Sequence, residues 1–181
     1  MSIRWLTGLL FAAALPLISM PAGAQEAART IGQYDKEAGV QYVASWENDD
    51  RWGNGILVQG GYKVNACRLW SWQCQGIAEF SVVHFDYFDA SFKQFALGVR
   101  FGKLMWPKIR TFGQFQVGVQ NDGFDDSSSG VVYMPGFGVN YALTRRFDAQ
   151  VLVDFPIADY DSGTYNQARL GIGVGLPLGP R

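Results

Sequence analysis

The sequence is poor in charge, histidine and cysteine, and each shortage excludes a class of protein. Charged residues make up 17% of its 181 residues, against about a quarter in an average soluble domain, so its surface is under-charged for water. The formal net charge is −1 and no basic patch occurs, which argues against a nucleic-acid partner. One histidine and two cysteines are too few for a zinc site, and we expect no metal and no cofactor.

The sequence also lacks a long apolar run that could form a membrane-spanning helix. Its N-terminal segment carries Arg4, a short apolar run over residues 9–18, and the triplet Ala22-Gly23-Ala24, which is typical of a signal-peptide cleavage site. The polar residues that follow show no clear periodicity. The sequence predicts a signal peptide over residues 1–24, a flexible leader over residues 25–36 and one domain over residues 37–181.

Glycine (22 residues) and aromatic residues (15%) are both plentiful, and they occur in two-residue alternation. Over residues 131–155, for example, Val139 and Val151 fall on an apolar face, and Gly138 and Gln150 on a face of glycine, amide and carboxylate. Such alternation across a tight turn predicts a β-hairpin. We find eight such segments, each taken as long enough for the roughly 9–11 residues that cross a bilayer obliquely. They cover about residues 40–46, 56–64, 75–87, 94–101, 114–120, 131–141, 147–155 and 167–176.

Two architectures share this pattern, and they differ in where the apolar face points. A soluble lipocalin-like barrel turns that face inward, whereas an outer-membrane barrel turns it toward lipid. The polar face, built from glycine and glutamine with single charges, lacks the lysine and glutamate of a water-facing surface. It suits the narrow interior of an eight-stranded barrel, where little space remains. The sequence therefore predicts an all-β fold, an eight-stranded antiparallel up-and-down transmembrane β-barrel, with Val139, Val151 and Ile172 facing lipid.

The links between the predicted strands alternate in charge. Odd-numbered links carry acids and even-numbered links carry bases, as expected when the two sets lie at opposite ends of the barrel. With a periplasmic N-terminus the acidic end faces outside the cell. Against this, the links around residues 65–75 and 102–110 are long for periplasmic turns. The acids are Glu47, Asp49, Asp50, Asp89, Asp122, Asp125, Asp126, Asp159 and Asp161, and the bases are Arg68, Lys103, Lys108, Arg110, Arg145 and Arg146.

Several short motifs resemble a known family, most clearly from about Gly98 onward. They are Phe112-Gly113-Gln114, Pro135-Gly136-Phe137-Gly138-Val139-Asn140-Tyr141, Arg146-Phe147-Asp148-Ala149 and Asn166-Gln167-Ala168-Arg169-Leu170-Gly171. These motifs resemble the outer-membrane β-barrel domain of OmpA-like and opacity-type proteins. The resemblance implies an eight-stranded barrel in a Gram-negative outer membrane, often without catalytic activity. The sequence departs from that family at its end, Leu176-Pro177-Leu178-Gly179-Pro180-Arg181, which lacks the usual terminal aromatic residue.

Two small groups of residues are candidate sites. Cys67 and Cys74 bracket six residues, and in an exported protein such a pair predicts a disulfide that staples a turn. His84 is followed by Asp86 on the same face and by Ser91 just past the next turn. A serine, a histidine and a carboxylate are the parts of a nucleophilic catalytic site, but spacing alone does not show their geometry, and an interfacial histidine is the simpler interpretation.

The polar face carries a set of charges that we expect to meet inside the barrel. Paired charges would fill the lumen and make it rigid. The predicted network consists of Lys63, Glu79, Arg100, Asp148, Asp154 and Arg169. The acidic stretch Asp122 to Asp126 lacks the ligand spacing of a calcium loop, so we interpret it as a solvated loop.

The resulting functional hypothesis is a small non-enzymatic outer-membrane barrel that serves envelope integrity or surface contact through its acidic loops. Two alternatives stay open: an outer-membrane enzyme that modifies lipid A, as a deacylase or acyltransferase, and a porin-like narrow pore for solutes. The expected partners are outer-membrane lipid, lipopolysaccharide and the barrel-assembly machinery. We expect a monomer with no nucleic-acid partner.

Overall fold

The computed structural model describes residues 35–47, 51–69, 72–87, 89–121, 129–144, 146–161 and 163–178, and only the backbone of residues 65–69. The predicted signal peptide lies outside these residues. In this part of the chain, no helix is long and apolar enough to cross a membrane. The strands are β1 (Lys36–Glu47), β2 (Arg51–Leu69), β3 (Trp72–Phe85), β4 (Ala90–Trp106), β5 (Ile109–Asn121), β6 (Ser129–Ala142), β7 (Asp148–Asp154), β8 (Ile157–Tyr160) and β9 (Gly163–Leu178).

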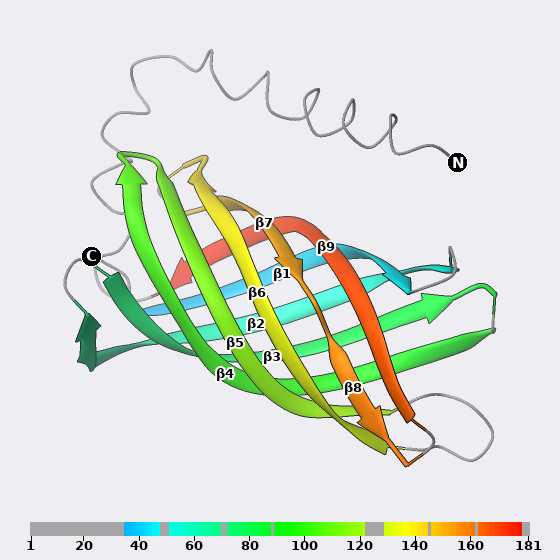
Figure 1. The fold of residues 1–181 in the computed structure, drawn as a ribbon. Coiled ribbons are helices and arrows are strands. Elements are labelled where there is room, and N and C mark those ends of the chain that lie inside the picture. The colour runs from blue at the N-terminus through cyan, green and yellow to red at the C-terminus, as the bar shows by residue number, and fades with distance from the viewer. Residues whose placement is uncertain are drawn as a thin grey trace.

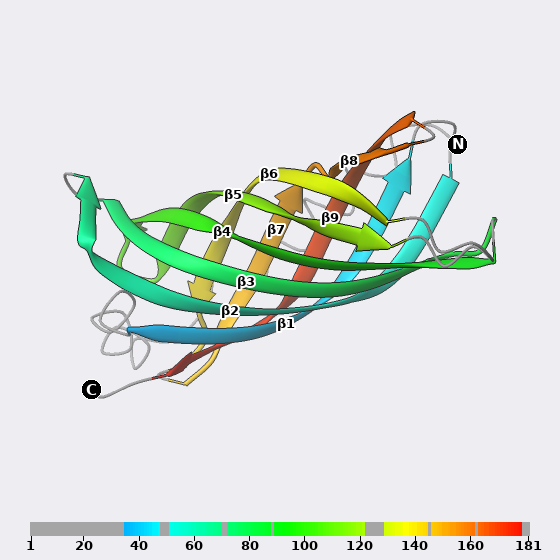
Figure 2. The same cartoon turned by 90° about the horizontal axis from the view of Figure 1, so that it is seen from below.

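The strands form one closed antiparallel barrel. From β1 to β7 each strand pairs with the next along the chain, and both β7 and β8 lie between β6 and β9. β1 closes the sheet against β9, from Lys36 opposite Leu178 to Glu47 opposite Gln167. Figures 1 and 2 show β1 and β9 side by side and the strands inclined around a common axis. Closure leaves no unpaired edge, which is the condition for a sheet inside a membrane.

β7 and β8 are two halves of one strand, so the barrel has eight strands as predicted. Gly136 of β6 pairs with Asp154, and Tyr133, three residues earlier, pairs with Ile157, three residues later. The register therefore continues through the gap. Pro156 lies in that gap, and a proline has no N–H to give to a ladder. The ladder loses only the bond that an N–H at position 156 would donate, because the N–H of Phe155 still donates to the carbonyl of Pro135 and the N–H of Gln167 to that of Pro156, each at 2.9 Å.

The direction of each face decides between the two barrel types. Val139 and Val151 are each 39% exposed and Ile172 is 55% exposed, whereas Gln150, next to Val151, is 2% exposed. Aromatic and aliphatic side chains cover the outside along most of the strands. A water-soluble barrel would bury this face, so the lipocalin-like alternative is wrong and the predicted outward positions are confirmed.

Close packing explains the glycines of the inner face. A Cβ atom at Gly98 or Gly118 would collide with the backbone of the neighbouring strand, and one at Gly173 would collide with the carbonyl oxygen of Val40. Any larger residue would push two strands apart. The narrow barrel therefore requires glycine at these positions, since it has no side chain to accommodate.

The two links that the alternating segments leave long for periplasmic turns, around residues 65–75 and 102–110, are short in the structure. Leu69 already pairs with Trp72, and Trp106 pairs with Ile109. The strands continue beyond the alternating segments, because backbone pairing does not need a regular pattern of side chains. The assignment of basic residues to these links is correspondingly wrong for three residues that lie in strands: Arg68, Lys103 and Arg110.

The orientation of the barrel can be tested at two described turn positions. Asp126 and Arg145 lie outside the described residues, so Asp161 and Arg146 are better sites. A cysteine at position 161 is expected to react with an impermeant maleimide on whole cells, and one at position 146 only after the outer membrane is opened. Wild-type cells give the background from Cys67 and Cys74. Labelling at position 146 alone would reverse the orientation.

Candidate functional site

Arg169 is the centre of a charge cluster inside the barrel. Its guanidinium Nε donates to Asp154 Oδ1 at 2.6 Å, and Nη2 donates to Asp154 Oδ2 at 2.9 Å and to Glu79 Oε1 at 2.7 Å. Nη1 donates to the hydroxyl of Ser81 at 2.9 Å. Arg169 is 2% exposed and its two carboxylate partners 1–2%. The cluster joins three separate strands, β3, β7 and β9, across the interior.

Arg100 forms a second cluster, toward the end of the barrel where β1 begins. Its Nη1 donates to Glu37 Oε1 at 2.6 Å, and its Nη2 donates to Gln59 Oε1 and to Gln114 Oε1, each at 2.7 Å. The guanidinium carbon lies 4.1 Å from the ring centre of Phe112. Arg100 is 0% exposed. A buried guanidinium is stable only with such partners, and here the partners come from β1, β2 and β5.

Four of the six residues of the predicted lumen network lie in these two separate clusters, and the other two, Lys63 and Asp148, lie in neither. Glu79, Asp154 and Arg169 belong to the first, and Arg100 belongs to the second. Asp148 is half-buried at the start of β7, where it is paired with Ala142 of β6. Lys63 is half-exposed near the end of the barrel.

Two members of the interior were not identified from the sequence. Glu37 lies at the predicted boundary between the leader and the barrel, and Arg110 was assigned to a turn. Arg110 is 5% exposed, and its Nη1 lies 3.5 Å from Glu37 Oε2. The two-residue alternation could have placed Arg110 inside, because Phe112 and Gln114 follow it on the same inward face. The missing information was that β5 begins at Ile109.

Glutamines and apolar side chains fill the remaining interior. Gln150 Oε1 accepts hydrogen bonds from Gln59 at 2.8 Å and from Gln41 at 3.3 Å. Two groups of buried apolar side chains pack around the polar clusters. They are Val43, Leu57, Val83, Phe85, Phe112 and Leu152, and Ala96, Val132, Met134, Ala158 and Tyr160. Among the described residues, the interior thus contains packed apolar side chains together with buried charges and amides.

On the outer wall, the structure brings His84 and Ser91 together. They are paired residues of β3 and β4, and His84 Nδ1 lies 3.1 Å from Ser91 Oγ. Nε2 lies 3.6 Å from Asp86 Oδ1 and 3.9 Å from Asp89 Oδ1. Both distances exceed a hydrogen bond, and both carboxylates are exposed, at 83% and 99% of their side-chain surface. The pair has a nucleophile and a base in contact, but the acids that would orient the base are loosely held.

The predicted disulfide lies partly outside the described side chains. Cys74 is 4% exposed, and only the backbone of Cys67 is described. The ladder places Lys63 opposite Gln75 and Arg68 opposite Gln73, with an irregular stretch between them. Cys74 is the β3 residue that faces this stretch, which contains Cys67. The two backbones are therefore neighbours, as a disulfide requires.

We predict that Cys67 and Cys74 form a disulfide in the exported protein. Titration of thiols in denaturant without reductant is expected to find none, and titration after reduction to find two per chain. A Cys67→Ser variant is expected to expose one reactive thiol, which controls for accessibility. Two thiols in the unreduced wild-type protein would contradict the prediction.

Comparison with known proteins rests on solved structures, because no family model and no curated protein matches the sequence. Neisserial surface protein A superposes with a TM-score of 0.60 and 13% identity, over 79% of this chain and 96% of that chain. The chain has the fold of an eight-stranded outer-membrane β-barrel. The outer membrane enzyme PagL is also similar, with a TM-score of 0.54 and 10% identity, over 79% of this chain and 99% of that one.

These similarities confirm the resemblance to OmpA-like and opacity-type barrels at the level of the fold. They also support the predicted location in the outer membrane. At 10–13% identity they carry no residue roles from one chain to the other. In the described residues, no cluster of histidine, cysteine and acidic side chains is arranged to hold a metal ion. The acidic stretch Asp122 to Asp126 lies outside those residues.

Proposed function

We propose that this protein is a small non-enzymatic outer-membrane barrel that serves envelope integrity or surface contact through an acidic rim. The observation that carries this proposal is the packed interior. Two buried arginine clusters and two apolar clusters join most of the strands from within, so the barrel is a rigid support rather than a passage. A rigid support is suited to holding a surface in place.

The acidic rim is the surface that the barrel presents. Asp86 and Asp89 lie in the turn between β3 and β4, and Asp159 and Asp161 lie at the turn between β8 and β9. All four are exposed. The turn between β4 and β5, which contains Lys108, and the turn between β6 and β7, which contains Arg146, lie at the opposite end of the barrel. We propose that the acidic rim faces outward and contacts cationic groups at the cell surface.

The role of the acidic rim is tested by replacing its four aspartates with asparagines, which remove the charges and keep the size of the side chains. In a strain that lacks the protein, the wild-type barrel is expected to restore exclusion of a hydrophobic dye, and Asp86→Asn/Asp89→Asn/Asp159→Asn/Asp161→Asn is expected to fail. The matched control, Lys108→Gln/Arg146→Gln, alters the other end and should complement fully. Complementation by the four-asparagine variant, at equal membrane levels, would exclude a role for the acids.

The porin-like alternative is tested by conductance. Wild-type protein in planar bilayers is expected to show no stable channel, because Arg100, Arg169 and the glutamines fill the interior. Heat-modifiable migration on a gel identifies the folded fraction of the same sample. Reproducible single-channel steps from folded wild-type protein would contradict the packed lumen and favour the pore.

A second candidate function is hydrolysis of a lipid ester, and the contact between His84 and Ser91 favours it. In that reaction Ser91 Oγ would attack an acyl carbonyl carbon while His84 Nδ1 takes the hydroxyl proton. The proton would then pass to the leaving alkoxide, and water would release the acyl group. The exposed, distant carboxylates make this the weaker candidate, since the base lacks a fixed orienting group.

Mass spectra of lipid A decide between the two functions. Cells with the wild-type protein, with Ser91→Ala and without the protein are expected to have the same lipid A. Loss of one acyl chain in the wild-type strain, absent from the Ser91→Ala strain, would establish the enzyme and overturn the non-enzymatic proposal.

A further inference from the structure

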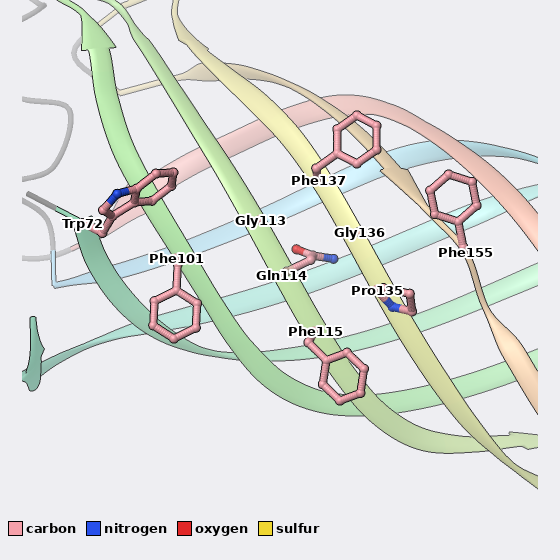
Figure 3. Close-up of a pocket in the computed structure, with 9 residues that line it drawn as sticks. All are labelled: Trp72, Phe101, Gly113, Gln114, Phe115, Pro135, Gly136, Phe137 and Phe155. Atoms are coloured by element: carbon pink, nitrogen blue, oxygen red, sulfur yellow. The ribbon is translucent and has the colours of Figure 1, made fainter. Parts of the chain in front are cut away.

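The lipid-facing wall contains a hollow with aromatic sides. It has a volume of about 470 Å³ and lies over β4, β5 and β6. Figure 3 shows the rings arranged around the backbone at Gly113 and Gly136. The side walls are Trp72, Phe101, Phe115, Pro135, Phe137 and Phe155.

Gly113 creates the hollow. It lies between Phe101 of β4 and Phe137 of β6 in one row of the sheet, so the row reads aromatic, empty, aromatic. A Cβ at Gly113 would have its nearest neighbour, the carbonyl oxygen of Gly136, at 3.9 Å. Packing within the protein therefore does not require glycine here, in contrast to Gly98 and Gly118, where a Cβ would collide with backbone.

A glycine that packing does not require needs another explanation, because it weakens a strand. Glycine in a strand often marks a place where a ligand approaches the backbone closely. The hollow opens onto the wall that faces acyl chains, and its sides are apolar. If the hollow were empty, the aromatic rings around it would lack dispersion contacts that an apolar occupant supplies. The chemistry of the site therefore suits a hydrocarbon chain.

A cationic side chain, Lys103, lies one outward-facing position beyond the residues that line the hollow. It is the next outward-facing position of β4 after Phe101 and is paired with Thr111, as Phe101 is paired with Gly113. Two residues of strand span about 6–7 Å, and this step leads toward the turn at Pro107 and Lys108. A lysine at the end of an apolar hollow, close to the membrane surface, attracts an anionic headgroup.

We propose that the hollow over Gly113 binds one acyl chain of an anionic phospholipid whose phosphate is held by Lys103. The aromatic walls are formed by paired strands, so the site exists before lipid binds and little ordering is needed. Lys103 gives the preference for an anionic headgroup, and the hollow accommodates one acyl chain of the same lipid. This inference requires only the membrane barrel and is independent of the role of the acidic rim.

Native mass spectrometry tests the site directly. Protein refolded in detergent with equal amounts of phosphatidylglycerol and phosphatidylcholine of the same chains is expected to retain one phosphatidylglycerol. Gly113→Val fills the hollow and should lose that adduct, while remaining heat-modifiable, since its Cβ has room. Lys103→Gln should reduce the preference for phosphatidylglycerol about five-fold, the effect of one surface lysine.

Two control variants separate the site from general effects on the wall. Val117→Leu adds bulk to β5 outside the hollow, and Lys93→Gln removes an outward lysine at the other end of β4. Both are expected to retain the adduct. An unchanged adduct in Gly113→Val would overturn the proposal. So would a dimer in the wild-type protein that Gly113→Val abolishes, because the occupant would then be a second copy of the chain.

Discussion

Replacing Arg169 by alanine is expected to lower the free energy of unfolding by about 3–5 kcal/mol, the usual cost of breaking a buried ion pair. The reason is that the variant leaves two buried carboxylates without their cationic partner. Asp154 loses two charge-assisted hydrogen bonds and Glu79 loses one, and both carboxylates stay inside the barrel, away from water. Equilibrium unfolding in urea, with the protein refolded into lipid vesicles, measures the difference.

Two further variants show whether charge is responsible. Arg146→Ala removes an exposed arginine from a turn and is expected to leave stability unchanged. Arg169→Met combined with Glu79→Gln and Asp154→Asn removes all three charges, and it should recover most of the loss because no buried charge is left without a partner. If Arg169→Ala unfolds at the same urea concentration as Arg146→Ala, the cluster does not stabilise the barrel.

Arginine in place of Val151 is expected to destabilise the membrane-inserted barrel by about 2–4 kcal/mol, the cost near the bilayer midplane on the lipid face. From the sequence alone, Gln150→Arg should be the milder change, since position 150 faces a polar interior. The structure alters this expectation. Gln150 is 2% exposed and bonded to Gln41 and Gln59, so arginine would overpack the interior. Both variants are expected to be unstable.

The environment of Val151 is therefore better tested with a probe than with stability. A bimane attached to a cysteine at position 151 is expected to be quenched by brominated acyl chains in vesicles. The same label at Asp161, an exposed turn residue, should be quenched weakly. Wild-type protein treated in the same way gives the background from the native cysteines. Absence of quenching at position 151 in folded protein would contradict the membrane barrel itself.

The candidate sites were harder to predict than the fold, for a physical reason. Alternation assigns Arg100 and Arg169 to the interior, but it does not indicate which carboxylate each one meets. Arg169 pairs with Glu79, 90 positions away, across the lumen. Arg100 pairs with Glu37, the second residue of β1, 63 positions away. Such contacts depend on the stagger between strands, and a stagger is a property of the closed sheet.

The outer-wall pair illustrates the same limit at short range. His84 and Ser91 are seven residues apart, and the sequence places both near one turn. Their contact at 3.1 Å exists because Phe85 pairs with Ala90 and makes the turn tight. A shift of the register by one residue would move one of them to the other face.

By itself the sequence determined the class of the protein, because alternation with a period of two, low charge and an apolar face too large for water are local properties of the chain. It also determined that Val139, Val151 and Ile172 face outward to lipid and that Gln150 faces the lumen. Only the tertiary structure decided where the strands end, that the arginines form two clusters, that Arg110 is inside and that Gly113 opens a hollow. These depend on closing the barrel, which sets the pairing of strands that are distant in the sequence and fills the space between them.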